Sequence, residues 1–244
     1  MKLAIAISGH TREMCEKTYP SLFQHILEKY DCDVFVSTFN RTGNRRFITN
    51  EGEKIHKQKE VNIEDIQNIY SPKILLGYDE LSPIQIQYNN RFNRFSTTMF
   101  KAECCFDMFC KIMTLNRKIE EYSCVYDIKY DYILRIRPDL EVISFNLNEV
   151  YDRGIAYLDM AKEEQICDVT FIGDYNTMIR MSHCWTHWEW LIESGQVPNI
   201  FNYAEHMFYR FNEYFNILFN IQKHRDEHTF IDYEVHRPYE ARWW

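Results

Sequence analysis

The sequence has few of the residues that interrupt regular structure. Glycine occurs 7 times and proline 6 times in 244 residues, so little of the chain has the composition of a linker. No stretch approaches the roughly 20 apolar residues needed to cross a bilayer, and the apolar run 1–7 is too short for a signal peptide. We therefore expect one domain, 1–244, in the cytoplasm (the host cytoplasm for a viral protein) and without a membrane span.

Positive charge is also scarce. The chain has 28 Lys and Arg against 36 Asp and Glu, for a net charge of −8. A surface of that sign repels the phosphates of nucleic acids and of anionic membranes, so no nucleic-acid partner is expected. The eight cysteines include no Cys-x-x-Cys pair, which disfavours a zinc knuckle, and a disulfide framework has no secretion signal to support it.

Apolar and aromatic residues are plentiful, at 45% and 16% of the chain, enough to form a large core. Short apolar runs predict strands at 2–8, 33–39, 73–78, 132–136, 154–158 and 169–172. Helical periodicity predicts helices at 18–30, from Asn62, at 97–122, 182–194 and 204–214. This alternation predicts an α/β, Rossmann-like domain with a mostly parallel central sheet and helices on both faces. The polar segment 41–60 is expected to be a long exposed loop that closes over a ligand, and the aromatic tail is expected to be irregular.

Ligands of such sheets bind at the carboxyl ends of the strands, where this chain has distinctive residues. Ser8, Gly9, His10 and Arg12 follow the first strand, and Thr38 lies near the end of the second. Glycine lets backbone N–H groups approach a ligand, and arginine can hold a phosphate through two hydrogen bonds. We expect a nucleotide to bind here; the alternative is an ordinary turn with a solvated arginine.

The fourth strand ends in the segment Arg135-Ile136-Arg137-Pro138-Asp139. Alternation places Arg135 and Arg137 on one face, and the proline turns the chain so that Asp139 emerges at the tip. Two guanidinium groups beside a carboxylate suit a metal-bound diphosphate, with Asp139 as the metal ligand. The alternative is an Arg–Asp ion pair that closes the strand. Further along, Asp168 is either a general base or simply the first residue of its strand.

Four other patterns imitate functional motifs. Asp31-Cys32-Asp33 has the Asp-x-Asp form of many sugar transferases, but it precedes its strand and is expected at the opposite edge of the sheet, so we reject it as a metal site. The His-x-x-Glu-His spacing at 224–228 matches a zinc peptidase class, but little chain follows it, and a solvated face is favoured. His183 and His187 are four residues apart among tryptophans, which favours packing. Glu205 follows Asn202 by three residues, so a capping role is the default and an acceptor-binding role the minority view.

Residues 8–12 (SGHTR), 33–39 (DVFVSTF), 130–140 (YDYILRIRPDL) and 168–173 together resemble a group of GT-A-fold glycosyltransferase-like proteins. That group occurs in bacterial surface-polysaccharide clusters and in large DNA viruses. The resemblance covers roughly residues 2 to 215, and its Arg-x-Arg-Pro-Asp core is its more specific part.

The resemblance implies a transferase that moves a sugar from a nucleotide-diphosphate donor to a glycan or other hydroxyl acceptor. The nucleotide would lie on the half at about 1–140 and the acceptor on the half at about 141–244. Arg12, Arg135 and Arg137 would grip the diphosphate. Asp139 would hold Mn or Mg, although GT-A enzymes usually have two carboxylates there and the arginines could neutralise the diphosphate unaided. Asp168 would deprotonate the acceptor in an inverting reaction.

Two other functions remain open. A binding module that kept the fold and lost catalysis would recognise a nucleotide or glycan, and the single carboxylate at Asp139 supports this alternative. A zinc peptidase is a distant third. The sequence does not indicate an oligomeric state.

Overall fold

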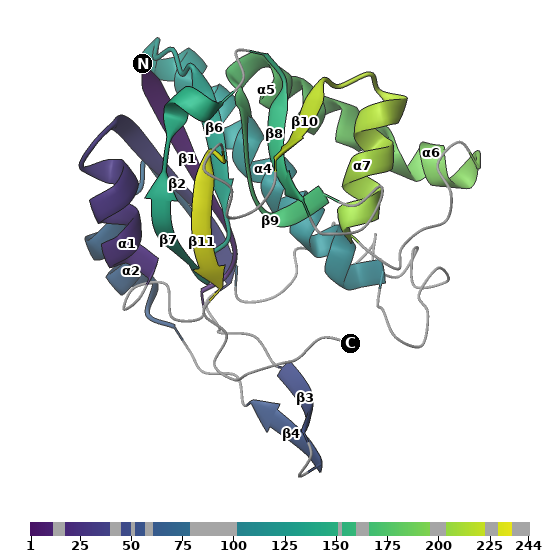
Figure 1. Cartoon of the computed structure of the whole chain (residues 1–244), viewed down its shortest axis with the longest axis horizontal. Helices are drawn as coiled ribbons and strands as arrows, with labels where there is room; N and C mark the ends of the chain where they lie inside the picture. Colours follow the sequence, from purple (N-terminus) through teal and green to yellow (C-terminus); the bar gives the residue numbers. More distant parts are fainter. Residues whose placement is uncertain are drawn as a thin grey trace.

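Seven strands form one central sheet in the order β10-β8-β9-β6-β1-β2-β5 (Figure 1). Its strands are β1 (Lys2–His10), β2 (Asp31–Phe39), β5 (Ile74–Tyr78), β6 (Tyr132–Ile136), β8 (Ile155–Asp159), β9 (Ile166–Asp174) and β10 (Phe219–Gln222). This computed structural model describes residues 1–11, 18–39, 45–49, 52–56, 61–78, 102–150, 153–159, 166–195, 204–222 and 229–235. The predicted α/β class, with a mostly parallel sheet between helices, is confirmed.

One strand of the sheet runs against the others. Strand β9 is antiparallel to both of its neighbours, β6 and β8, whereas the pairs β1–β2, β1–β6, β2–β5 and β8–β10 are parallel. From β1 the chain continues to β2 and β5 on one side, and it later returns to place β6 on the other side. The strand order therefore reverses between β1 and β6, which is the topological switch point of the sheet.

The run of β1 is apolar on both faces because both faces are covered. Leu3, Ile5 and Ile7 point to one layer, whereas the small side chains of Ala4 and Ala6 point to the other. Since alanine has little volume, the long helix α4 (Ala102–Tyr126) can lie close to β1 and β2. Strand β1 is an interior strand of the sheet, between β6 and β2.

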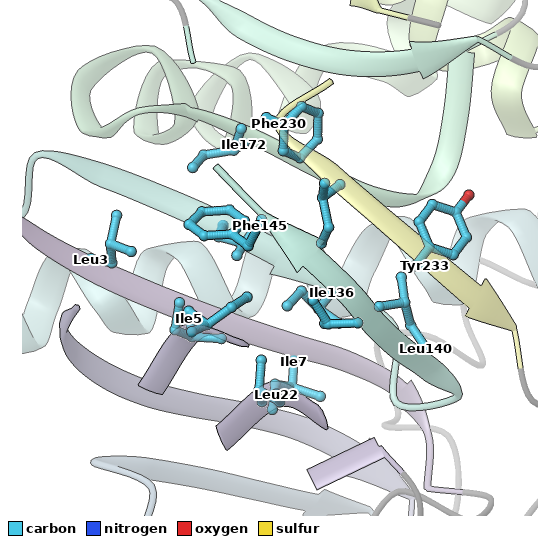
Figure 2. Packing of buried hydrophobic residues seen from close by; sticks show 14 of the residues in the cluster. Leu3, Ile5, Ile7, Leu22, Ile136, Leu140, Phe145, Ile172, Phe230 and Tyr233 are labelled. Carbon is cyan, nitrogen blue, oxygen red and sulfur yellow. The ribbon is translucent and has the colours of Figure 1, made fainter. Parts of the chain in front are cut away.

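Helices α4, α5 (Tyr175–Cys184) and α7 (Ala204–Tyr214) share one core cluster on the alanine face of β1. The opposite cluster joins β1 to α1 (Tyr19–Leu22), to the π-helical turn η2 (Phe23–Leu27) and to α2 (Ile63–Tyr70). Figure 2 shows Ile5 and Ile7 of β1 beside Leu22 of α1 in this cluster. On that face also lies a two-stranded antiparallel sheet of β7 (Leu140–Phe145) and β11 (Ile231–Val235). Both faces of the central sheet are thus buried.

Three expectations about local structure need correction. The segment 41–60 is not wholly a loop, because β3 (Arg45–Thr49) and β4 (Gly52–His56) pair in it as an antiparallel hairpin. The tail contains β10 and β11, so it is not wholly irregular. The helix expected over 182–194 is divided into the end of α5, the 3-10 turn η5 (Trp185–His187) and α6 (Trp188–Glu193).

Other expectations hold. Strand β6 has the expected bounds, and Asn62 caps α2 by accepting a hydrogen bond from the Glu64 N–H at 3.0 Å. The 3-10 turn η4 (Leu147–Glu149) completes the elements of the described chain. Among the helices described, none combines the length and apolar character required to span a membrane.

Candidate functional site

The carboxyl ends of β1 and β6 meet at the switch point. Residue Ile7 of β1 pairs with Ile136 of β6, so Gly9 and Pro138 follow side by side. In sheets of this class the switch point is where ligands bind. We define the switch-point site as the residues at this edge that the sequence singled out and the structure describes: Ser8, Gly9, His10, Thr38, Arg135, Arg137, Asp139 and Asp168.

The end of β1 is held from both sides. Thr38 is fully buried, and its hydroxyl donates to the Gly9 carbonyl at 2.7 Å, which braces β2 against β1. His10 is part-exposed, and its ring stacks on Phe39 at 4.6 Å between centroids. The space beside Gly9 is filled by the ring of Pro138. Arg12 lies outside the described residues.

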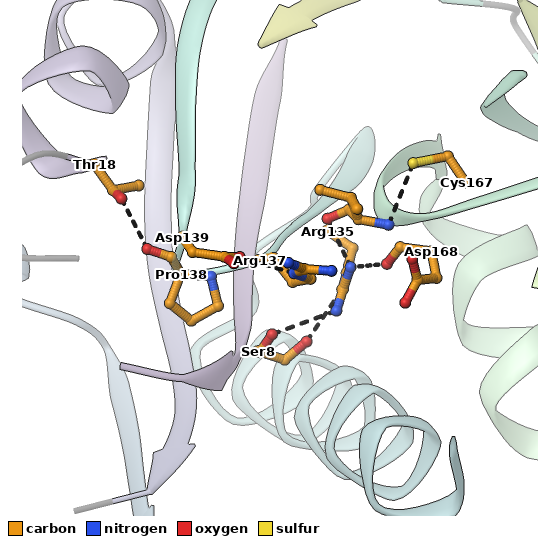
Figure 3. A network of polar contacts seen from close by, with 9 residues as sticks. Ser8, Thr18, Arg135, Arg137, Pro138, Asp139, Cys167 and Asp168 are labelled. Atoms are coloured by element: carbon orange, nitrogen blue, oxygen red, sulfur yellow. Dashed lines mark hydrogen bonds and ion pairs between the residues drawn. The ribbon is translucent and has the colours of Figure 1, made fainter. Parts of the chain in front are cut away.

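Arg135 is buried, with only 1% of its surface exposed. Its Nε donates to the Ser8 hydroxyl at 3.2 Å, and its two terminal nitrogens donate to the carbonyls of Ser8, Asp168 and Val169 (Figure 3). Burial lowers its pKa to about 10, against the opposing attraction of Asp168, so the guanidinium stays charged at neutral pH. The exposure expected for this side chain is therefore not found, because its hydrogen bonds are made inside the protein.

Arg137 and Asp139 form a two-point ion pair. Arg137 Nε donates to Asp139 Oδ1 at 2.8 Å and a terminal nitrogen donates to Oδ2 at 2.6 Å. The Arg137 side chain is 15% exposed and that of Asp139 only 1%. Asp139 therefore does not emerge at the tip as expected, and the ion-pair alternative describes what this turn contains. Arg137 is the more accessible of the two.

The reversed direction of β9 brings Asp168 to the site. Because β9 runs antiparallel to β6, its first residues lie beside the last residues of β6, and Arg137 N–H donates to the Val169 carbonyl at 3.0 Å. Asp168 is part-exposed, and its carbonyl accepts from Arg135. The sequence singled out this residue, but not the strand direction that places it here.

The residues present do not fit a divalent cation in this arrangement. Both Asp139 oxygens accept from Arg137, and no group of three His, Cys, Asp or Glu side chains suitable for a metal gathers in the part of the chain that is described. Metal binding at Asp139 would require the ion pair to open. Metal binding at Asp139 stays a prediction.

Sequence reasoning missed Lys111, a buried cation on α4. Its side chain is on the core side of the helix, 2% exposed, and its Nζ lies 3.6 Å from the centroid of the Phe39 ring that stacks on His10. The sequence did hold a signal for this buried cation: a lysine stands between Cys110 and Ile112 in an otherwise apolar helical stripe. Lys111 adds positive charge close to the ends of β1 and β2.

Asp31 and Asp33 lie at the amino edge of the sheet, as expected. Asp33 accepts from Tyr130 Oη at 2.7 Å and contacts the ammonium groups of Lys2 at 3.2 Å and Lys73 at 3.5 Å. Asp31 contacts Lys2 at 2.8 Å. These carboxylates connect β2 to its neighbours at the edge opposite the switch-point site.

The other patterns that imitate functional motifs provide no metal site among the described residues. His183 Nε2 lies 2.9 Å from Glu120 Oε2 and links α5 to α4, while His187 is exposed. The segment 224–228 and Asn202 lie outside the described residues, and of Glu205 only the backbone in α7 is described. No protein-family model matches the chain, and the curated proteins contain no match to it.

Proposed function

We propose that the switch-point site binds the diphosphate of a nucleotide sugar, and that the protein is a GT-A-like glycosyltransferase with a glycan or other hydroxyl acceptor. The observation that carries the proposal is the meeting of Gly9, Arg137 and Asp168 where the strand order reverses. The resemblance of residues 130–140 to such transferases supports the same function.

The charges at this edge suit a diphosphate. The hydrogen bonds of Arg135 go to a hydroxyl and to carbonyls, all uncharged acceptors, so its positive charge acts on the site from within. Arg137 is part-exposed and can exchange its carboxylate partner for a phosphate. Lys111 and His10 lie on the β2 side of the same edge. The three cations Arg135, Arg137 and Lys111 outnumber the carboxylates of Asp139 and Asp168 at this edge, in contrast to the net charge of −8 of the whole chain.

The proposed reaction needs a base and a stabilised leaving group. The acceptor oxygen forms a bond to the anomeric carbon of the donor sugar while the bond from that carbon to the diphosphate oxygen breaks. The acceptor proton passes to the Asp168 carboxylate, and the nucleoside diphosphate leaves with the electron pair. Fixed cations lower the energy of the charge that grows on the departing oxygen, and losing one such contact typically costs about 100-fold to 1000-fold in rate.

The test is a thermal-shift screen of the whole protein with UDP, GDP, CDP and ADP and their common sugar conjugates, each with and without Mn. A bound nucleotide at 100 times its Kd stabilises a protein by about 2.7 kcal/mol. We expect at least one nucleoside diphosphate to raise the Tm. Arg137→Met should abolish the rise, and Arg180→Met, at an exposed arginine of α5, should preserve it. Absence of any shift in the wild type would overturn the proposal.

A binding module without catalysis is the second candidate. The burial of the Asp139 carboxylate against Arg137 favours it, because the one acid in the Arg-Pro-Asp segment is already paired. Release of nucleoside diphosphate from the donor, measured with and without Mn, separates the two functions. A transferase releases it, whereas a pure binder shows the thermal shift and no release.

A further inference from the structure

Arg135 lies between the two strands that its side chain connects. In the sheet, β6 has β1 on one side and β9 on the other, with Arg135 opposite Ala6 and Phe171. The guanidinium carbon lies 5.9 Å from the centroid of the Phe171 ring. From this position the three nitrogens reach Ser8 of β1 and the carbonyls of Asp168 and Val169 of β9 (Figure 3).

These contacts begin where the regular ladder stops. The pairing of β6 with β9 ends at Ile136 and Thr170, and Thr170 also donates its hydroxyl to the Arg135 carbonyl at 2.9 Å. Beyond that point, toward the start of β9, the Asp168 carbonyl accepts from Arg135, and the Val169 carbonyl accepts from Arg135 at 2.6 Å and from the Arg137 N–H at 3.0 Å. On the side of β9 that faces β6, the Asp168 carbonyl is therefore held by the Arg135 side chain rather than by the regular ladder.

The planar fork of arginine is needed for this geometry. A guanidinium has five N–H groups in fixed directions and can bond two strands at once, whereas a lysine ammonium at the end of a flexible stem cannot reproduce both sets of contacts. The bonds of Arg135 to Ser8 and Val169 are buried and the bond to the Asp168 carbonyl is part-buried, so the bonded N–H groups point to protein acceptors rather than toward a ligand.

We propose that Arg135 is a positioning residue that fixes the Asp168 backbone against Ser8, and so places the Asp168 carboxylate for proton transfer, without touching the donor. The inference rests on the proposed function for the role of Asp168. It differs from a diphosphate-gripping role for Arg135, which would show as a loss of diphosphate affinity.

The first experiment measures the backbone directly and needs no activity. Amide hydrogen exchange is compared by mass spectrometry in the wild type, Arg135→Lys and Arg135→Met. Arg180→Met is the control, because Arg180 is exposed and its contacts, to the Phe215 carbonyl and to Cys184, lie away from 166–170 and 8–11 in the sequence. We expect exchange to rise at least tenfold in peptides covering 166–170 and 8–11 in both Arg135 variants, and not in the control. Unchanged exchange at 166–170 would overturn the proposal. If Arg135→Met does not fold, Arg135→Lys decides.

The second experiment separates positioning from donor contact. Pyrophosphate affinity, measured by calorimetry, should stay within about threefold of the wild type in Arg135→Lys and fall at least tenfold in Arg137→Met. A tenfold loss in Arg135→Lys instead assigns Arg135 to direct binding and overturns the proposal. Failure of the wild type to bind pyrophosphate counts against the proposed function, and the exchange result then decides the role of Arg135 by itself.

The third experiment uses donor turnover. Displacing a catalytic group by about 1 Å can cost about 100-fold in rate, so Arg135→Lys should lower kcat by about that factor with little change in KM. In the Asp168→Asn background the same change should have no further effect, because the group that it positions is already gone. Equal losses in both backgrounds would contradict a positioning role.

Discussion

Gly9 and Pro138 lie so close that a Cβ atom on Gly9 would be 2.9 Å from Cδ of Pro138. Gly9 also has a φ of +140°, which side chains other than that of glycine rarely permit. The contact joins the end of β1 to the residue that follows Arg137 after β6, and β1 and β6 are the two strands at the switch point. Glycine is therefore required here by the packing of the protein itself, whether or not a ligand also approaches.

Gly9→Ala is expected to destabilise the protein by about 3 kcal/mol, because backbone strain and overpacking each cost about 1 to 3 kcal/mol. Gly195→Ala is the matched control: Gly195 has a φ of +70° but nothing within 4 Å of an added Cβ. It should cost about 1 kcal/mol. Urea unfolding measures both, and equal losses would show that the Pro138 contact does not matter.

The Arg137–Asp139 pair should respond unequally to removal of its two members. Arg137→Met removes two charged hydrogen bonds from a carboxylate that is 1% exposed and should cost about 3 to 5 kcal/mol. Asp139→Asn leaves a guanidinium that is 15% exposed and can turn to water, so about 1 to 2 kcal/mol is expected. The free energy of unfolding of both single variants and of the double variant, measured at pH 7, tests these two values. Equal, small losses would argue against a tight pair.

The two carboxylates of Asp31-Cys32-Asp33 should also differ. Asp33 is buried and accepts from Tyr130, so Asp33→Asn should cost about 2 kcal/mol. Asp31 is 66% exposed, and Asp31→Asn should cost at most about 1 kcal/mol. Because both lie at the edge opposite the switch-point site, nucleotide affinity should survive in both folded variants. A loss of affinity in Asp31→Asn would revive the motif as a ligand site.

Stability should fall with rising pH above about 9. Burial first, and the negative charge of Asp31 second, raise the pKa of Cys32 from 9.0 to about 12. Between these two values the unfolded chain releases the thiol proton while the folded chain keeps it, so unfolding becomes easier as pH rises.

Cys32→Ala should flatten that decline between pH 9 and pH 11, because the titrating thiol is gone. Cys124→Ala, at an exposed cysteine, should retain the slope of the wild type. Urea midpoints at four pH values measure the slopes. An unchanged slope in Cys32→Ala would remove Cys32 as the cause.

Several strands were predictable because their apolar runs are local and uninterrupted, as in β1 and β6. Strand β7 was missed because Pro138 and Asp139 were interpreted as a tip rather than as a tight turn into another strand. Strand β10, Phe219–Gln222, was missed because its alternating polar residues are typical of a short edge strand as well as of an irregular tail. Sequence periodicity cannot indicate the direction in which a strand runs, so the reversal of β9 was not predicted.

The candidate site, too, was predictable only in part from the sequence. Position at the sheet edge was predictable for Ser8, Gly9 and Arg137, since residues that follow a buried strand must lie there. The partner of each side chain was not: Arg137 pairs with Asp139, whereas Arg135, two residues earlier, is turned inward between Ser8 and Asp168.

The amino-acid order by itself determined where buried strands and helix faces form, because burial of apolar side chains at a period of 2 or 3.6 residues is a local property. Only the tertiary structure decided which arginine is enclosed, which acid is paired and that Asp168 arrives beside them. A long guanidinium bonds whichever carbonyls and carboxylates the neighbouring strands present, and those neighbours are set by the order and direction of strands from distant parts of the chain.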